Sequence, residues 1–290
     1  MSGFLDEMAR SSAQRVAQAA QRESLGALER RARQTPPAPP LRLSAAGFDV
    51  IAELKLRSPA AGVLRDSDHD WLGRISAYAR GGAAAVSVLT EPSRFDGSLQ
   101  HLREAAAALA PLGVPAMRKD FIVEPYQVVE ARAAGAGGVL IILRMLPRAR
   151  LAELLEVAAG HGMFVLLEAF DAADLELAGE LLEALPAAEA RPARAPPARG
   201  VPPEGGYLVG VNCRDLQSLE VVPERFAQLA SHLPGRWPAV AESGVNSAAD
   251  AQRVRQLGYR LALIGTALMS RDDPAAFLAE IFDASRTVPP

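Results

Sequence analysis

The sequence predicts an α/β protein, a (β/α)₈ TIM barrel with an extra N-terminal helix. Eight short apolar segments follow one another along the chain, and most lead into apolar residues at helical spacing. The segments are nearly continuous runs of Val, Ile, Leu and Ala, which is typical of parallel strands covered on both faces. No glycine-rich dinucleotide fingerprint follows the first segment, so a doubly wound sheet is disfavoured.

The first 45 residues or so are expected to form a helical extension of the barrel. Apolar residues such as Phe4, Met8, Val16 and Leu28 predict one helix over about residues 4–33, which the proline-rich run at 35–40 ends. We expect the whole chain, 1–290, to form a single barrel domain. Its strands are predicted at 50–55, 84–90, 115–120, 138–143, 164–169, 208–212, 239–243 and 261–265.

Helix starts between these strands carry recognisable signals. Ser98 and Ser247 stand where N-caps are expected, and Pro125 and Pro147 stand at or just before the first turn of a helix. One gap between strands is unusually wide and holds a Pro/Ala/Arg-rich insertion at about 186–206. Because it joins the fifth helix to the sixth strand, we expect it at the N-terminal face, away from the usual active site. A docking segment is the alternative interpretation.

Composition excludes several classes of function. A net charge of −3 and an aromatic content of 5% argue against nucleic-acid binding. The single cysteine, Cys213, excludes an internal disulfide framework and a thiolate zinc cluster, and the four histidines lack metal-ligand spacing, so we expect no metal. There is no apolar run of membrane length, and acidic residues near the N-terminus are unlike a signal peptide. A cytoplasmic protein without membrane contact is expected.

The chain contains only two lysines, Lys55 and Lys119, among its 31 basic residues. Arginine does not release its proton in proteins, whereas a partly desolvated lysine does. The two lysines are therefore candidates for chemistry, although codon bias alone is an alternative explanation.

Polar residues end most of the predicted strands, and the carboxyl ends of all strands open on one face of a barrel. These residues are Glu53, Lys55, Arg118, Lys119, Asp120, Glu168, Asn212, Arg214, Glu242 and Ser243. We expect a catalytic cluster there, with Arg118 pointing outward to solvent. The alternatives are structural ion pairs, between Glu53 and Lys55 or between Glu168 and Arg214.

Small residues after the last two strands predict a phosphate site. Ser243-Gly244 and Gly265-Thr266 allow backbone amides to approach an anion, and Ser58 after the first strand adds a hydroxyl.

Several segments together resemble the indole-3-glycerol-phosphate synthase family of tryptophan biosynthesis. They are Ile51-Ala52-Glu53-Leu54-Lys55 with Ser58-Pro59, Ser87-Val88-Leu89-Thr90-Glu91, Arg118-Lys119-Asp120-Phe121-Ile122, Val211-Asn212-Cys213-Arg214-Asp215 and Glu242-Ser243-Gly244. Two positions depart from the family pattern. Members usually have Asn where Cys213 stands, and Ser-Lys where this chain has Ala60-Ala61.

The resemblance implies ring closure of 1-(2-carboxyphenylamino)-1-deoxyribulose 5-phosphate with loss of carbon dioxide and water, without a cofactor. It implies Lys119 as proton donor, Glu168 as base, and Lys55 as partner of the substrate carboxylate and second acid. Glu53 would hold both lysines, Asn212 the ribulose hydroxyls, Arg214 the carboxylates and Phe121 the aromatic ring. The phosphate would lie at Ser58, Ser243, Gly244, Gly265 and Thr266. Which lysine gives which proton stays open.

The implied partner is a small phosphorylated substrate. We further expect a monomer, with contacts to other enzymes of tryptophan biosynthesis as an additional expectation. Two other functions remain as alternatives. A phosphoribosylanthranilate isomerase shares the fold but uses a Cys where this chain has Lys55, and a non-catalytic barrel that binds a phosphorylated ligand needs neither lysine.

Overall fold

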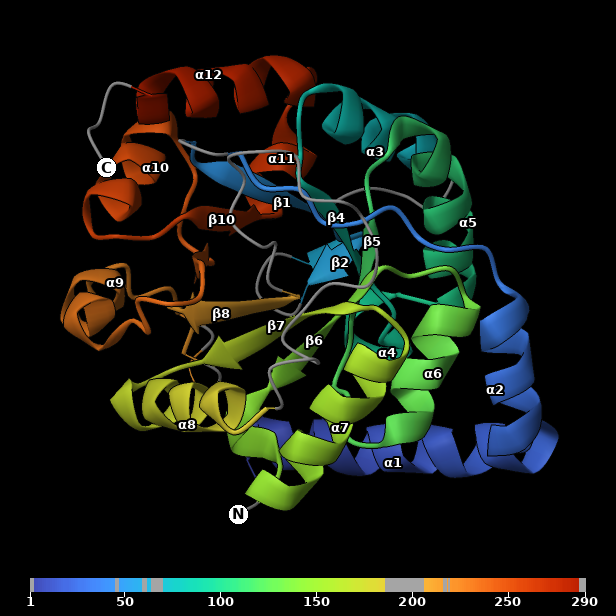
Figure 1. Ribbon diagram of the computed structural model, residues 1–290. Coiled ribbons are helices and arrows are strands. Elements are labelled where there is room, and N and C mark those ends of the chain that lie inside the picture. Colours follow the sequence, from blue (N-terminus) through green and yellow to red (C-terminus); the bar gives the residue numbers. More distant parts are fainter. Residues whose placement is uncertain are drawn as a thin grey trace, which may run out of the picture.

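The computed structural model describes residues 3–44, 47–58, 62–63, 70–185, 206–215, 218 and 220–286. The insertion predicted at about 186–206 lies almost wholly outside these residues. The described part is a barrel of parallel strands within a ring of helices (Figure 1).

All eight predicted strands are confirmed, with ends within a residue or so of the expected ones. They are β1 (Asp49–Leu54), β4 (Ala85–Leu89), β5 (Ala116–Lys119), β6 (Gly138–Ile142), β7 (Phe164–Ala169), β8 (Tyr207–Asn212), β9 (Ala239–Glu242) and β10 (Leu261–Ile264). They close in the order β1-β10-β9-β8-β7-β6-β5-β4, and each strand pairs with its neighbours in parallel. The polar strand ends therefore do meet at one face of the barrel.

The outer ring consists of α3 (Trp71–Arg80), α5 (Leu99–Leu109), α6 (Pro125–Ala133), α7 (Arg148–Gly160), α8 (Ala172–Glu183), α9 (Glu224–Leu229), α10 (Ala248–Gln256) and α12 (Pro274–Arg286). The expected caps are present, since Ser98 accepts from the His101 amide and Ser247 from the Asp250 amide. Two short helices, α4 (Pro92–Phe95) and α11 (Thr266–Ser270), follow β4 and β10. Short 3₁₀ turns cover Ala110–Leu112, Leu143–Met145 and Ala230–His232, and a hairpin of β2 (Arg57–Ser58) with β3 (Gly62–Val63) follows β1.

The N-terminal extension is two helices, so the prediction of a single helix over 4–33 was wrong. The chain is extended at Glu23, and α1 (Phe4–Arg22) ends there. Ser24 then caps α2 (Leu25–Gln34) by accepting a hydrogen bond from the Ala27 amide. The buried face of α2 packs on α6 in a cluster of Leu28, Ala32, Tyr126, Val129 and Ala133.

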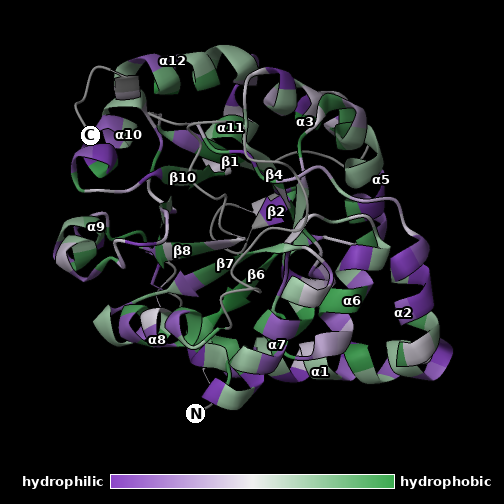
Figure 2. Ribbon diagram, in the orientation of Figure 1, coloured by the Kyte–Doolittle hydropathy of each residue, from purple (hydrophilic) through white to green (hydrophobic). Residues whose placement is uncertain are grey.

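The barrel contains two layers of apolar packing. The inner layer includes Ile51, Met117, Leu140, Leu166 and Leu208, and Phe4, Leu5 and Met8 of α1 pack against it. The outer layer lies between the strands and the helices. Figure 2 shows the hydrophobic strands and the mixed faces of the helices around them. Helix α1 therefore borders the barrel at the carboxyl ends of β5 and β6, where it contacts α6 and the turn at Leu143–Met145.

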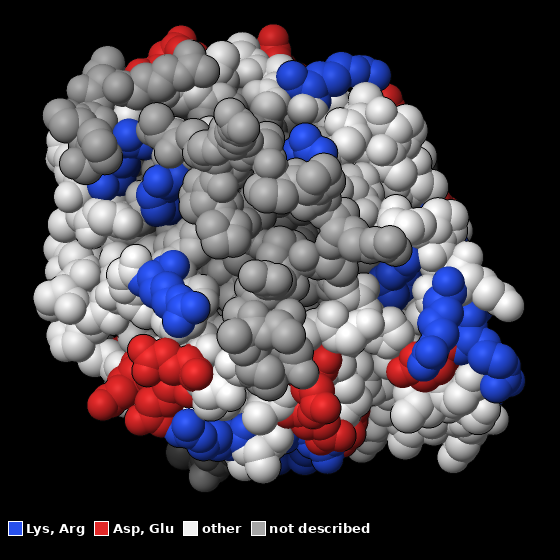
Figure 3. Space-filling view, viewed as in Figure 1, with Lys and Arg blue, Asp and Glu red and all other residues white. Residues whose placement is uncertain are grey.

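The surface carries charges of both signs. In the view of Figure 3, acidic side chains gather over α8, which has exposed Glu176, Glu180 and Glu183, and basic side chains gather over α2, which has exposed Arg30 and Arg33. No helix in the described ranges is long and apolar enough to cross a membrane.

Candidate active site

A cavity of about 230 Å³ opens at the carboxyl ends of the barrel strands. Every predicted site residue except Ser58 lines it: Glu53, Lys55, Lys119, Phe121, Glu168, Asn212, Arg214, Ser243, Gly244, Gly265 and Thr266. The backbone of Ser58 lies in β2, and its side chain is outside the described part of the structure. The barrel thus brings together side chains, from Glu53 to Thr266, that are separated by more than two hundred residues in the sequence.

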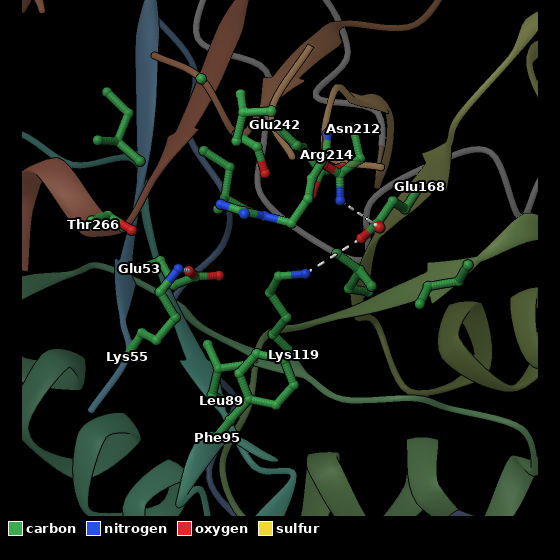
Figure 4. A pocket seen from close by; sticks show the side chains of 18 of the residues that line it. Glu53, Lys55, Leu89, Phe95, Lys119, Glu168, Asn212, Arg214, Glu242 and Thr266 are labelled. Atoms are coloured by element: carbon green, nitrogen blue, oxygen red, sulfur yellow. Dashed lines mark hydrogen bonds and ion pairs between the residues drawn. The ribbon is translucent and has the colours of Figure 1, made fainter. Parts of the chain in front are cut away.

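Lys119 and Glu168 face each other across the cavity (Figure 4). The Lys119 Nζ lies 3.3 Å from Glu168 Oε2, and the Asn212 amide donates to Glu168 Oε1 at 2.9 Å. Burial lowers the pKa of Lys119, but Glu168, Glu242 and Glu53 outweigh this effect and raise the pKa above its ordinary value. Lys119 is therefore a protonated amine beside a carboxylate, which is the arrangement of an acid and a base.

Glu53 and Lys55 form a second pair at the end of β1. Glu53 Oε1 lies 2.9 Å from Lys55 Nζ. Burial would raise the pKa of Glu53, yet the charges of Lys55 and Lys119 hold it below the usual value. Glu53 was expected to accept hydrogen bonds from both lysines. It accepts one from Lys55, whereas Lys119 donates to Glu168 instead. The Glu53–Lys55 ion pair that was an alternative reading thus exists, inside the cavity.

Asn212 is engaged on both sides of its amide. Its nitrogen donates to Glu168, and its Oδ1 accepts from the Arg214 backbone amide at 2.9 Å. This geometry orients the Glu168 carboxylate and anchors the start of the loop that carries Arg214. Glu168 contacts Lys119 and Asn212, rather than forming the alternative structural ion pair with Arg214.

Glu242 is a site residue to which the sequence reasoning gave no role. Its side chain points into the cavity from the end of β9 (Figure 4), and neither carboxylate oxygen has a hydrogen-bond partner among the residues that the structure describes. Burial and the nearby charge of Glu168 raise its pKa well above the ordinary value. The position of Glu242 at the polar end of a predicted strand was the signal in the sequence that it could be a site residue. That its carboxylate is buried without a hydrogen-bond partner is visible only in the structure.

The turn after β9 has an unusual backbone. Ser243 has φ 64° and Gly244 has φ 77°, so two successive residues are left-handed, and the first is not glycine. Cys213 packs beneath this turn, because its Sγ lies 3.3 Å from the Ser243 carbonyl oxygen. Burial raises the pKa of the Cys213 thiol to about 11, so the thiol is uncharged at neutral pH and packs against the turn.

Aromatic rings form one wall of the cavity, and two of the three were missed from the sequence. The Phe121 ring lies 5.8 Å from the Phe4 ring, edge to face, and 6.3 Å from the Phe95 ring. Phe4 comes from α1 and Phe95 from α4. The Glu91 side chain caps α4 by accepting hydrogen bonds from the Ser93 and Arg94 amides. An acidic residue followed by proline, Glu91-Pro92, was the sequence signal from which the start of this short helix could have been predicted.

Arg118 is buried, so the prediction that it points outward to solvent was wrong. Its side chain is 2% exposed and pairs with Asp120 and Glu130, both at 2.9 Å. An arginine is tolerated there because two carboxylates and the Thr90 hydroxyl satisfy it.

No group of three or more His, Cys, Asp or Glu residues in the described ranges has the geometry of a metal site. The chemistry available at the cavity is proton transfer between lysines and carboxylates, next to an aromatic wall.

The family model for indole-3-glycerol phosphate synthase matches residues 5–185 and 204–281 of this chain. Similar proteins of that name come from several bacteria. One from a Parafrankia species is 41% identical over 263 residues, which cover 90% of this chain and 88% of the relative. The one from Leifsonia xyli is 41% identical over 86% of this chain and 86% of the relative. The one from a Nocardioides species is 42% identical over 82% of this chain and 82% of the relative.

Solved structures show the same barrel at low sequence identity. The 3-hexulose-6-phosphate synthase of Salmonella typhimurium matches with a TM-score of 0.57 at 11% identity, over 82% of this chain and 98% of that one. A phosphoribosyl anthranilate isomerase in complex with reduced 1-(o-carboxyphenylamino)-1-deoxyribulose 5-phosphate matches with a TM-score of 0.52 at 11% identity, over 83% of this chain and 100% of that one. These likenesses concern the fold alone.

Proposed function

The chain belongs to the indole-3-glycerol phosphate synthase family, and from this premise we propose how the residues of its cavity divide the reaction. The reaction closes the indole ring of 1-(2-carboxyphenylamino)-1-deoxyribulose 5-phosphate and releases carbon dioxide and water. The observation that carries the proposal is the Lys119 Nζ held 3.3 Å from Glu168 Oε2 in one cavity, where the surrounding carboxylates raise the pKa of Lys119.

Ring closure needs an acid at the ketone. The ring carbon that bears the carboxylate attacks the ketone carbon, and the carbon–carbon bond forms while the ketone oxygen gains negative charge. The raised pKa of Lys119 keeps its amine protonated throughout the neutral range, and Lys119 donates that proton to the developing alkoxide, which is the stronger base. Loss of carbon dioxide then returns the bonding electrons to the ring.

Dehydration needs an acid and a base on opposite sides of the new ring. The hydroxyl group leaves as water after it takes a proton, and the adjacent methylene carbon gives up a proton to complete the indole. Glu168 is the base, oriented by the Asn212 amide. Lys55 faces the same cavity and is the candidate second acid, and it neutralises the substrate carboxylate before decarboxylation.

The remaining groups bind the substrate. Phe121, with Phe4 and Phe95 beside it, packs on the aromatic ring, and Arg214 orients the carboxylate. The phosphate binds at the Ser243-Gly244 turn and at Gly265-Thr266, where small residues leave the backbone accessible. Ser58 remains a proposed contributor to this site.

Turnover by the purified chain tests the proposed function. Incubation with the ring-closure substrate should give indole fluorescence. A phosphoribosylanthranilate isomerase would consume its own substrate and give no indole, and a non-catalytic barrel would bind without turnover. We also propose that the chain is a monomer, that it is cytoplasmic, and that it contacts other enzymes of tryptophan biosynthesis. Sedimentation of the purified chain tests whether it is a monomer.

A further inference from the structure

The carboxylate of Asp120 accepts five hydrogen bonds, and it lies in the chain between Lys119 and Phe121. Arg15 donates to both oxygens, at 3.1 and 2.8 Å, and Arg118 donates to Oδ2 at 2.9 Å. The Thr90 hydroxyl donates to Oδ2 at 2.7 Å, and the Phe121 amide to Oδ1 at 2.9 Å. The side chain has no exposed surface. A carboxylate with this many donors has one allowed position.

The charges around Asp120 balance. Arg118 continues from Asp120 to Glu130, and its guanidinium also donates to the Gln127 carbonyl oxygen at 2.8 Å. Burial by itself would raise the pKa of Asp120, but Arg118 and Arg15 hold it well below the usual range. Asp120 is therefore ionised at every working pH. Both of its oxygens are held by several donors, which restricts its movement, although the buried Nε of Arg15 has no hydrogen-bond partner among the described residues.

Helix α1 reaches this network from outside the barrel. Ser12 donates to the Phe121 carbonyl oxygen and accepts from the Gln127 side-chain amide at 2.9 Å. Ser12 and Arg15 are three residues apart, so they share one face of the helix. Helix α1 thus holds both the Asp120 carboxylate and the backbone of Phe121.

We infer that Asp120 is a positioning residue, through which Arg15 of α1 fixes the backbone that carries Lys119. Arg118 and Lys119 are successive residues of β5 and point to opposite sides, so Lys119 enters the cavity while Arg118 is anchored behind it. Asp120 follows the strand at the edge of the cavity and joins Arg118 to Arg15. Proton transfer tolerates little displacement, since about 1 Å of misplacement costs on the order of 10²-fold in rate. The inference rests on the proposed role of Lys119.

The test compares Arg15→Ala, Arg15→Lys and Asp120→Asn with the control Glu7→Gln. Glu7 lies on the same helix and pairs with Arg94 at 2.7 Å, so the control removes an ion pair of α1 that does not touch Asp120. Turnover by the unmodified chain is measured first, and establishes the proposed function separately. Each variant is then assayed for kcat, KM and melting temperature, with kcat expressed per folded molecule.

Arg15→Ala should lower kcat about tenfold and change KM less than threefold, because Lys119 moves while Ser12 still holds the Phe121 carbonyl oxygen. Arg15→Lys should recover most of the loss, and Glu7→Gln should leave kcat unchanged. Arg15→Ala in the Asp120→Asn background should cost no further kcat, because Arg15 acts through that carboxylate.

Three results would overturn the inference. The first is a normal kcat in Arg15→Ala. The second is a rise in the KM of Arg15→Ala with kcat unchanged, which would mean that α1 only forms part of the binding wall. The third is a kcat in the double variant that falls by the product of the two single losses. If Asp120→Asn does not fold, the comparison of Arg15→Ala, Arg15→Lys and Glu7→Gln still decides, since Arg15 is partly exposed on a helix.

Discussion

Gly265 leaves room for the carboxylate of Glu53. A Cβ atom at Gly265 would lie 2.5 Å from Glu53 Oε1 and 3.3 Å from Glu53 Cβ. The backbone at Gly265 has φ −115°, which any residue adopts, so the requirement for glycine here is one of space. The proposed phosphate site and the Glu53–Lys55 pair therefore share one wall.

Substitution of Gly265 should affect both catalysis and binding. Gly265→Val should raise KM, because the side chain fills space that a phosphate oxygen needs, and should lower kcat at least tenfold, because Glu53 must leave Lys55. Thr266→Ser is the matched control and should be nearly silent. Steady-state kinetics of both variants check this.

Sulfate gives an independent check of the same wall. It should inhibit the unmodified chain competitively with substrate, and Gly265→Val should weaken that inhibition. Equal inhibition of both proteins would place the anion elsewhere.

Glu168→Gln should lower kcat by about 10²–10⁴-fold and alter its pH profile, because the amide cannot accept the proton. Glu176→Gln, on the exposed face of α8, is the control and should leave both kcat and its pH profile unchanged. An unaltered pH profile in Glu168→Gln would remove Glu168 from the acid–base roles.

Glu242 should make stability depend on pH. Its pKa in the folded chain is raised, so the folded state keeps a proton that the unfolded state loses. Stability therefore falls as pH rises from about 4.5, the ordinary value, toward the folded pKa. Glu242→Gln removes this penalty, so its melting temperature should exceed that of the unmodified chain increasingly above pH 4.5. A constant difference from pH 4 to pH 8 would contradict the raised pKa.

Deletion of the insertion should leave activity near normal. The segment joins the end of α8 to the start of β8, and such connections lie at the amino ends of the strands, opposite the cavity. Because the entropy of loop closure depends only weakly on loop length, replacing about residues 187–203 by a short Gly/Ser link should change stability little. Loss of turnover in a deletion variant that still folds would show that the segment reaches the site.

Much of the site was predictable because barrel geometry carries strand ends to one face. The positions of Lys119, Glu168 and Glu53 follow from the strand pattern alone. The features of the site that the sequence did not predict depend on contacts between segments that are distant in the chain. Phe4 reaches the cavity only because α1 packs at the carboxyl ends of β5 and β6, and the Arg118 environment needs Glu130 on the next helix. The break at Ser24 was missed because apolar spacing continues across it.

The most direct test of the central claim is the turnover of Lys119→Met. The claim is that Lys119, protonated beside Glu168, is the acid of ring closure. The variant should bind substrate nearly as well as the unmodified chain, and indole fluorescence should report a kcat lower by about 10²–10⁴-fold. Near-normal kcat in Lys119→Met would contradict the claim and assign the proton to Lys55.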